Sequence, residues 1–302
     1  MTEGAGAPRN PLAVAILATL VLGSVKLAAG VGTGSAAVLA SAADSLADAG
    51  VSGMNLLMMR HAARPADADH HYGHGKAEAL ATLAQALVLG GLVVGIGWHA
   101  VDQLVSATHP PVAAGPAIAA MVVSMAGSFG ISTFLARAAD RTGSLVLRGD
   151  AVHYRMDLYT GAAVLAGLLV TLLTGEGRAD AIASLLVCAL MAKDVEGLLR
   201  DAVRELMDSP LPDDERVVVA AVLDGFLPRI RGWHDLRTRR AGPSRFVQFH
   251  LVLPDDMLLI DAHALTHEIE HAVAAALPGL EVLVHVDAEG APDDEPPPGV
   301  QA

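Results

Sequence analysis

Two pairs of ionisable residues interrupt otherwise apolar stretches of the chain, and the members of each pair are four residues apart. Asp44 and Asp48 form the first pair, and His153 and Asp157 form the second. Residues four apart share one face of a helix. Each such group would cost roughly 2.5–3.5 kcal/mol at the centre of a membrane, so four of them together require a compensating partner. A divalent cation is one such partner, because three carboxylates and one imidazole make a plausible four-coordinate site.

An alternative interpretation is that these groups pair with cations such as Lys26 or Arg155, or line a water-filled cavity. Ionisable groups inside a membrane are usually functional, which favours the metal interpretation. Asp150 lies one turn before His153, and for it we expect a salt bridge with Arg148 or Arg155.

The elements that would position these residues are six long apolar stretches. They cover 12–31, 37–59, 77–105, 112–135, 145–173 and 179–199. Each is near or above the roughly 20 residues that cross about 30 Å of hydrocarbon. Hydrophobic residues make up 53% of the chain and charged residues only 18%, which few soluble domains match. We therefore expect an all-α, six-helix transmembrane bundle over 1–208, embedded in a lipid bilayer.

The basic residues of the connecting loops indicate the orientation of the bundle. One side carries Arg9, Arg60, Arg64, Lys76, Arg137, Arg141 and Arg148, whereas the opposite loops offer Arg178. Cytoplasmic loops are enriched in Lys and Arg. Both termini are therefore predicted to be cytoplasmic.

The pattern changes after the last apolar stretch. Helices are expected at 213–226 and 261–277, and strands at 233–239, 245–253 and 281–287. This order, αββαβ, predicts a small α+β domain over 209–289, and the Pro- and Asp-rich end at 290–302 is predicted to be disordered. The domain is acidic and rich in histidine, which argues against nucleic acid and is compatible with metal cations. The single Cys188 excludes disulfide frameworks and multi-cysteine zinc sites.

Over nearly its whole length the chain resembles the cation diffusion facilitator family. The pairs Asp44/Asp48 and His153/Asp157 fall where that family places its transport site. The resemblance implies six transmembrane helices, a metallochaperone-like cytoplasmic domain and a homodimer. It implies a carrier and not an enzyme: a proton-coupled antiporter that exports divalent metal by alternating access, here from the cytoplasm across a bacterial inner (plasma) membrane.

The identity of the metal is predicted from the ligand set. The Asp/Asp/His/Asp combination resembles the zinc-type set of the family, so Zn2+ is the expected cargo. Such ligands also tolerate Cd2+, Fe2+, Co2+ and Mn2+, because selectivity depends on geometry that a sequence does not show. The leading alternative is an iron(II)- or manganese-selective carrier of the same family.

The polar loop between the second and third stretches carries a second candidate site. Asp67, His70 and His74 could bind zinc, although polar residues in a loop are ordinary. The resemblance favours the ligand interpretation, because these three match the family's loop site. His71 lies outside that pattern and its role is left open.

The cytoplasmic domain carries a third candidate site, implied by the resemblance. Its binuclear ligand set would be His234, His250, His263, His285 and Asp287. These residues fall on different elements, so their spacing alone says little. Metal bound there would either sense cytoplasmic metal or hold the dimer together. Lys76 and Asp208 resemble the family's charge pair that links the two subunits near the membrane surface.

A short motif in the same domain suggests a different class of protein. His267-Glu268-Ile269-Glu270-His271 fits H-E-x-x-H, the helix signature of zinc proteases. A membrane-anchored metalloprotease would also need a third ligand and a substrate cleft. So small a domain offers little room for either, which makes this alternative the weaker one.

Overall fold

The computed structural model describes residues 11–34, 36–106, 115–174, 179–277 and 279–290. The chain divides into two compact units between Leu206 and Met207. The first unit is helical and the second combines helices with a sheet. The predicted disordered end lies, apart from residue 290, outside the described residues.

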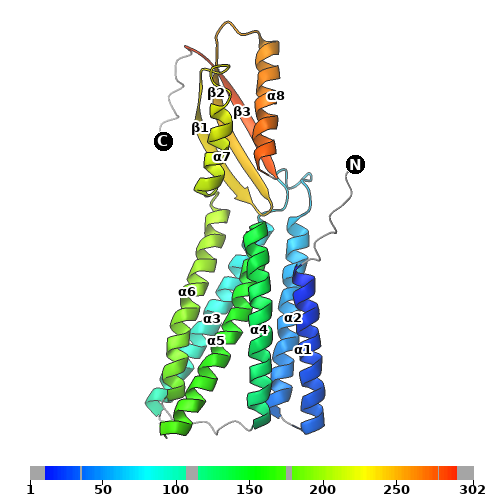
Figure 1. Ribbon diagram of the computed structural model, residues 1–302, viewed down its shortest axis with the longest axis vertical. Helices are drawn as coiled ribbons and strands as arrows, with labels where there is room; N and C mark the ends of the chain where they lie inside the picture. Colours follow the sequence, from blue (N-terminus) through cyan, green and yellow to red (C-terminus); the bar gives the residue numbers. More distant parts are fainter. Residues whose placement is uncertain (1–10, 35, 107–114, 175–178, 278, 291–302) are drawn as a thin grey trace. The chain divides into compact units, whose positions relative to one another are not determined.

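Six long helices make up the described part of the first unit (Figure 1). They are α1 (Pro11–Thr33), α2 (Ala36–Ala62), α3 (Ala77–Ser106), α4 (Gly115–Thr142), α5 (Leu145–Thr174) and α6 (Ala179–Leu206). α1 packs along α2, α3 along α6, and α5 along both α4 and α6. α2 also contacts α5, and these are the two helices that carry the acidic and histidine pairs. The six predicted helices are therefore confirmed.

Three of these helices have a composition that suits a membrane span. The segments Pro11–Gly32, Ala77–Val105 and Ile118–Thr142 are long enough and apolar enough to cross a bilayer. α2, α5 and α6 are equally long, but they carry the charged residues that lower their mean hydropathy. That these three also cross the membrane stays a prediction.

The largest differences from the predicted ends concern α4 and α6. Both helices continue past the apolar stretch, to Thr142 and Leu206 respectively. The additional turns still bury small side chains against the bundle, because Ala139 and Ala202 are almost fully buried. Hydropathy therefore marks where the apolar stretch ends, whereas packing decides where the helix ends.

Small residues bring α1 and α2 close together. A Cβ atom at Gly23 would lie 3.1 Å from the Leu46 side chain, and one at Gly30 would lie 2.8 Å from that of Leu39. Membrane helices use such residues to let their backbones approach. The two contacts lie on either side of Lys26, so the turn of α1 that carries Lys26 lies close to α2.

The second unit is a three-stranded sheet with two helices, in the order α7 (Asp213–Asp224), β1 (Gly232–Ala241), β2 (Ser244–Leu253), α8 (Leu259–Ala276) and β3 (Leu280–Ala288). The predicted αββαβ order is confirmed. β2 is central, antiparallel to β1 and parallel to β3. The parallel pairing requires a crossover between β2 and β3, and α8 supplies it.

The two faces of this sheet differ in burial. Along β2, Val247, Phe249 and Leu251 are buried and pack with Leu265 and Ile269 of α8. Side chains alternate between faces along a strand, so His250 lies on the face turned away from this core. That face is available to polar ligands.

Candidate metal centres

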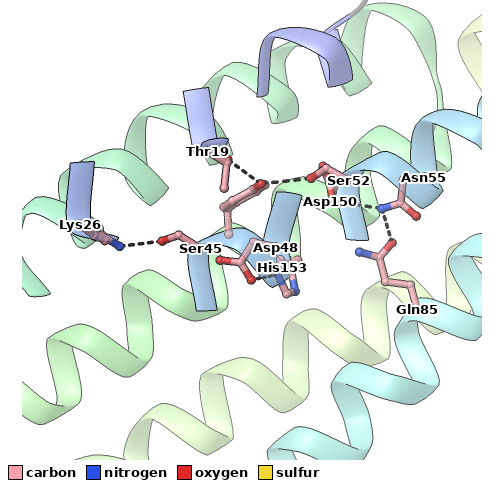
Figure 2. Close-up of polar contacts among 10 residues, drawn as sticks. Thr19, Lys26, Ser45, Asp48, Ser52, Asn55, Gln85, Asp150 and His153 are labelled. Carbon is pink, nitrogen blue, oxygen red and sulfur yellow. Dashed lines mark hydrogen bonds and ion pairs between the residues drawn. The ribbon is translucent and has the colours of Figure 1, made fainter. Parts of the chain in front are cut away.

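The contact between α2 and α5 brings three of the four predicted membrane ligands together. Asp48, His153 and Asp157 each place one ligand atom within 4.8 Å of the others. His153 Nε2 lies 3.1 Å from Asp48 Oδ1 (Figure 2), and both side chains are largely buried. We call these three residues the membrane cluster.

One carboxylate oxygen of the membrane cluster has no protein partner. Asp157 Oδ2 is buried and accepts no hydrogen bond within the part of the chain that the structure describes. A buried acceptor without a partner is costly. A bound cation would satisfy it, which fits a metal ligand.

The fourth predicted ligand, Asp44, is not part of this group. It lies one turn before Asp48 on α2, and its side chain is exposed. Its carboxylate nevertheless attracts the ammonium group of Lys26, as those of Asp48 and Asp157 do. That Asp44 completes the ligand set stays a prediction.

The residues around the membrane cluster hold α2 and α5 in register. Asp150 is fully buried and accepts hydrogen bonds from Ser52 at 2.8 Å and from Asn55 at 3.0 Å (Figure 2). Tyr154 contacts the Ser52 hydroxyl at 3.1 Å and Thr19 of α1 at 2.9 Å. We call these five residues the polar network. They link α2 and α5 close to Asp48 and His153.

The expected salt bridge of Asp150 is wrong. Arg148 pairs instead with Asp201 of α6 at 2.5 Å, and Arg155 pairs with Asp194 at 2.8 Å. Both arginines point toward α6, whereas Asp150 points toward α2, because consecutive positions of a helix face different neighbours. Residues 48, 52 and 55 repeat at helical spacing, and that pattern could have indicated Ser52 and Asn55 as neighbours of the ligands.

The loop between α2 and α3 forms a second cluster. Asp67, His70 and His74 place ligand atoms within 4.8 Å of one another, and the Asp67 carboxylate lies 3.4 Å from His70 Nδ1 and 3.3 Å from His74 Nε2. Backbone N–H groups of His70 and Asp69 donate to Asp67 Oδ1. The His70 N–H contributes most to lowering the pKa of Asp67, so this carboxylate is charged at neutral pH. His71 is exposed and outside the group.

The register of the sheet forms a third cluster. His234, His250 and His285 lie directly beside one another on β1, β2 and β3. Asp287 lies two residues after His285, and one of its carboxylate oxygens is 2.9 Å from His250 Nδ1 and 3.2 Å from His234 Nε2. Its other oxygen lies 3.3 Å from His285 Nε2. One carboxylate thus faces three imidazoles, which suits borderline metals such as zinc. We call these four residues the sheet cluster.

The fifth predicted ligand of this site, His263, is not brought to the sheet cluster within one chain. It lies on α8, which covers the opposite face of the sheet, and its ring is 4.5 Å from that of His267. Its assignment as a ligand stays a prediction.

In the H-E-x-x-H motif on the same helix, the glutamate is paired with an arginine. Both Glu268 oxygens accept hydrogen bonds from Arg229, at 2.7 and 2.6 Å. These bonds lower the pKa of Glu268. A carboxylate held in this way is a poor general base, so the geometry argues against the protease interpretation.

The predicted charge pair between subunits involves one residue from each unit. Lys76 Nζ donates to the Leu206 carbonyl at 3.4 Å, and Asp208 lies 3.4 Å from Arg239. Both residues therefore have partners within their own unit. Their role between two subunits stays a prediction.

Comparisons with known proteins cover nearly the whole chain. Residues 12–207 match the family model described as the cation efflux transmembrane domain, and 211–289 match the model for the cytoplasmic domain of cation efflux proteins, named ZT_dimer. The cation-efflux pump FieF of Cronobacter sakazakii is 35% identical over 279 residues, covering 92% of both chains. That of Serratia proteamaculans is 36% identical over 278 residues and covers 91% of both.

Solved structures match part of the chain. The zinc form of the putative zinc transporter CzrB is 43% identical, covers 28% of this chain and 94% of its own, and has a TM-score of 0.26. The metal-bound C-terminal domain of the CzcD transporter from Thermotoga maritima is 29% identical, covers 26% of this chain and 91% of its own, and has a TM-score of 0.25.

Proposed function

The chain belongs to the cation efflux family of membrane transporters, the cation diffusion facilitators, and we propose that it exports Zn2+ from the cytoplasm in exchange for protons. The observation that carries this proposal is the membrane cluster, in which two carboxylates and one imidazole from two helices converge on one point. Buried ionisable groups at membrane depth usually mark the path of an ion. Zinc is the favoured cargo because the donor set of carboxylate oxygen and imidazole nitrogen suits it.

The proposed transport site consists of Asp44, Asp48, His153 and Asp157. Such groups bind metal only when they are deprotonated, so metal and protons compete for the same atoms. Facing the cytoplasm, the site would load the ion. Facing the opposite side, it would release the ion as protons bind. His153 is the natural proton carrier, because a free imidazole titrates near pH 6.5.

The contact between His153 and Asp48 supports this competition. The 3.1 Å separation between His153 Nε2 and Asp48 Oδ1 is a hydrogen-bond distance. A metal ion bound by both residues would have to replace that hydrogen bond. The same two atoms can therefore hold either a proton or the ion, which is the minimum requirement of an exchanger.

The other two clusters have supporting roles in this proposal. The loop site of Asp67, His70 and His74 would bind zinc near the cytoplasmic entrance. The sheet cluster would bind zinc in the cytoplasmic domain and hold or draw together the two subunits of a homodimer, an assembly that the name of the matching domain model indicates. Lys76 and Asp208 would link the subunits near the membrane surface. Both termini would lie in the cytoplasm, beside a bacterial inner membrane.

The test is zinc flux in proteoliposomes driven by a pH gradient. Asp48→Asn keeps the shape of the side chain but removes an anionic ligand. Loss of a residue that only orients a metal ligand costs about 10–100-fold in metal affinity or activity. Asp48 is a proposed direct ligand, so we expect flux to fall by at least about 100-fold. Asp140→Asn is the matched control, since Asp140 is an exposed carboxylate of α4 outside the cluster. Parent-like flux in Asp48→Asn would refute the assignment of the site.

The same preparation decides the identity of the ion. Flux of Zn2+, Cd2+, Fe2+, Co2+ and Mn2+ is compared with and without the pH gradient. Zinc is expected to be carried fastest and to acidify the side from which it leaves. Faster transport of Fe2+ or Mn2+ would establish the iron(II)- or manganese-selective alternative. A zinc flux that is the same with and without the pH gradient would rule out antiport.

A further inference from the structure

One buried cation lies next to the membrane cluster. Lys26 is a residue of α1, only 4% exposed, within one of the most apolar helices of the chain. A buried ammonium group is costly unless anionic or polar groups compensate it. Its position therefore requires an explanation from its neighbours.

The packing of α1 against α2 fixes where this ammonium lies. Gly23 and Gly30, one turn before and one turn after Lys26, allow the two helices to approach closely. Lys26 Nζ donates a hydrogen bond of 2.7 Å to Ser45 Oγ (Figure 2). Ser45 is itself buried and lies between Asp44 and Asp48 in the sequence. The ammonium is thus attached to the helix that carries the predicted carboxylate ligands.

The anionic groups that face Lys26 are those of the proposed transport site. The carboxylates of Asp48, Asp44 and Asp157 all attract the ammonium. Arg155, which lies between His153 and Asp157 in the sequence of α5, pairs with Asp194 instead. Lys26 is therefore the cation that α1 contributes to this group of carboxylates.

We propose that Lys26 is a tethered counter-cation of the transport site, which sets the charge of that site to match one divalent ion and limits how tightly the ion is held. This inference rests on the proposed function and adds a residue that does not ligate the metal. Three carboxylates and a neutral imidazole carry a formal charge of −3. With Lys26 the charge is −2, and one divalent ion neutralises it.

The consequence for transport follows from Coulomb's law. The ammonium repels a bound cation, and at low effective dielectric constant this repulsion acts over several ångströms. A carrier must release its cargo. A site with a larger negative charge would release the ion slowly, and weaker binding speeds this release. Removing the positive charge should therefore tighten zinc binding and lower the turnover rate together.

The test uses the full chain and separates charge from hydrogen bonding. Lys26→Met removes both, Lys26→Gln keeps a donor for Ser45 without the charge, and Lys26→Arg keeps the charge. Lys193→Met is the matched control, because Lys193 is an exposed lysine of α6 in the same unit. Zinc affinity is measured by titration in a His74→Ala, His250→Ala background, so that binding reports on the membrane cluster. KM and the maximal flux are measured in proteoliposomes.

We expect Lys26→Met and Lys26→Gln to bind zinc about tenfold more tightly or better, with KM and maximal flux both lowered. Lys26→Arg and Lys193→Met should resemble the parent. Unchanged affinity in the two uncharged variants would overturn the inference. Weaker binding would also overturn it, because Lys26 would then support the geometry of the ligands through Ser45. A parent that carries no zinc would refute the proposed function, whereas the titration would still decide the effect of Lys26 on affinity.

Discussion

The membrane cluster and the sheet cluster use the same kinds of ligand but are built in different ways. The membrane cluster takes its residues from two helices and lies among buried side chains. The sheet cluster takes its histidines from three neighbouring strands, and half or more of the His234 and His285 side chains is exposed. The first is surrounded by protein and the second faces solvent.

The two clusters also differ in what supports them. Behind the membrane cluster lies the polar network of Asp150, Ser52, Asn55, Tyr154 and Thr19, whose hydrogen bonds join α1, α2 and α5. The sheet cluster is positioned by backbone pairing, which places its histidines beside one another on three strands.

These two kinds of support predict where each site can change. A site held by side-chain hydrogen bonds between helices depends on the relative position of those helices, which the proposed alternating access would change. A site held by strand register keeps its geometry as long as the sheet is folded. We therefore expect the first to respond to changes in its support and the second to respond mainly to loss of a ligand.

Replacing Asp150 with asparagine is the change that should affect the two sites most differently. Asp150→Asn replaces an acceptor of two hydrogen bonds with a group that can accept only through one oxygen. Because residues that position metal ligands typically contribute 10–100-fold to metal affinity or activity, zinc flux should fall by about that factor. KM should rise as well, since Asp48 and His153 would be held less firmly. Flux and KM are measured in proteoliposomes.

The control for Asp150→Asn is Asp140→Asn, which removes an exposed carboxylate from the same unit. Zinc bound by the sheet cluster should be the same in both variants. Parent-like flux and KM in Asp150→Asn would show that the polar network does not position the ligands.

A second prediction concerns the ligand that is central in the sheet. His250→Ala should weaken zinc binding at the sheet cluster by more than about 100-fold, because a direct ligand is worth more than an outer-shell partner. Zinc flux should change far less than in Asp150→Asn, since the membrane cluster is intact. Titration of zinc into the full chain measures whether one binding site is lost, and the flux assay measures the effect on transport.

His271→Ala is the matched control for this variant, because His271 is an exposed histidine of α8 outside the sheet cluster. It should leave the number of zinc ions bound at that cluster unchanged. A loss of flux in His250→Ala as large as in Asp48→Asn would contradict the separation of the two sites.

A smaller effect is expected on the stability of the cytoplasmic unit. Glu215 of α7 accepts two hydrogen bonds of 2.9 Å from Arg245 of β2, and these bonds lower the pKa of Glu215. A carboxylate whose pKa is lowered by folding stabilises the protein above its unfolded pKa, about 4.5. That contribution disappears as the pH falls through the folded value.

Glu215→Gln should therefore lower the free energy of unfolding at pH 7 by about 1 kcal/mol, with little difference from the parent at pH 3. Unfolding is followed by the fluorescence of Trp233 in a Trp98→Phe background. An equal difference at both pH values would show that the ion pair does not contribute, and zinc flux at pH 7 should be unchanged.

Much of the fold could be predicted from the sequence because the patterns are local. Apolar stretches of sufficient length predicted all six long helices, and alternation predicted the three strands of the second unit. The ends of α4 and α6 were missed, because their last turns are stabilised by packing of Ala139 and Ala202 and not by hydropathy.

The candidate site could be predicted only in part. The four-residue spacings of Asp44/Asp48 and His153/Asp157 follow from helical geometry. The partner of Asp150 was predicted wrongly, since the spacing gives which residues share a face but not which helix that face meets. The histidines of the sheet were indicated by family resemblance alone, since His250 lies 16 positions after His234 and His285 lies 35 positions after His250.

The amino-acid sequence was sufficient to predict the long apolar helices, the αββαβ unit and the acidic and histidine residues that could bind a divalent ion. Those features depend on composition and on periods of a few residues. The folded chain was needed to establish that Asp150 pairs with Ser52 and Asn55, that His263 faces away from the sheet cluster, and that Lys26 lies beside Ser45. These features involve residues on different helices and strands. They depend on which faces of those elements meet and on how closely the elements approach.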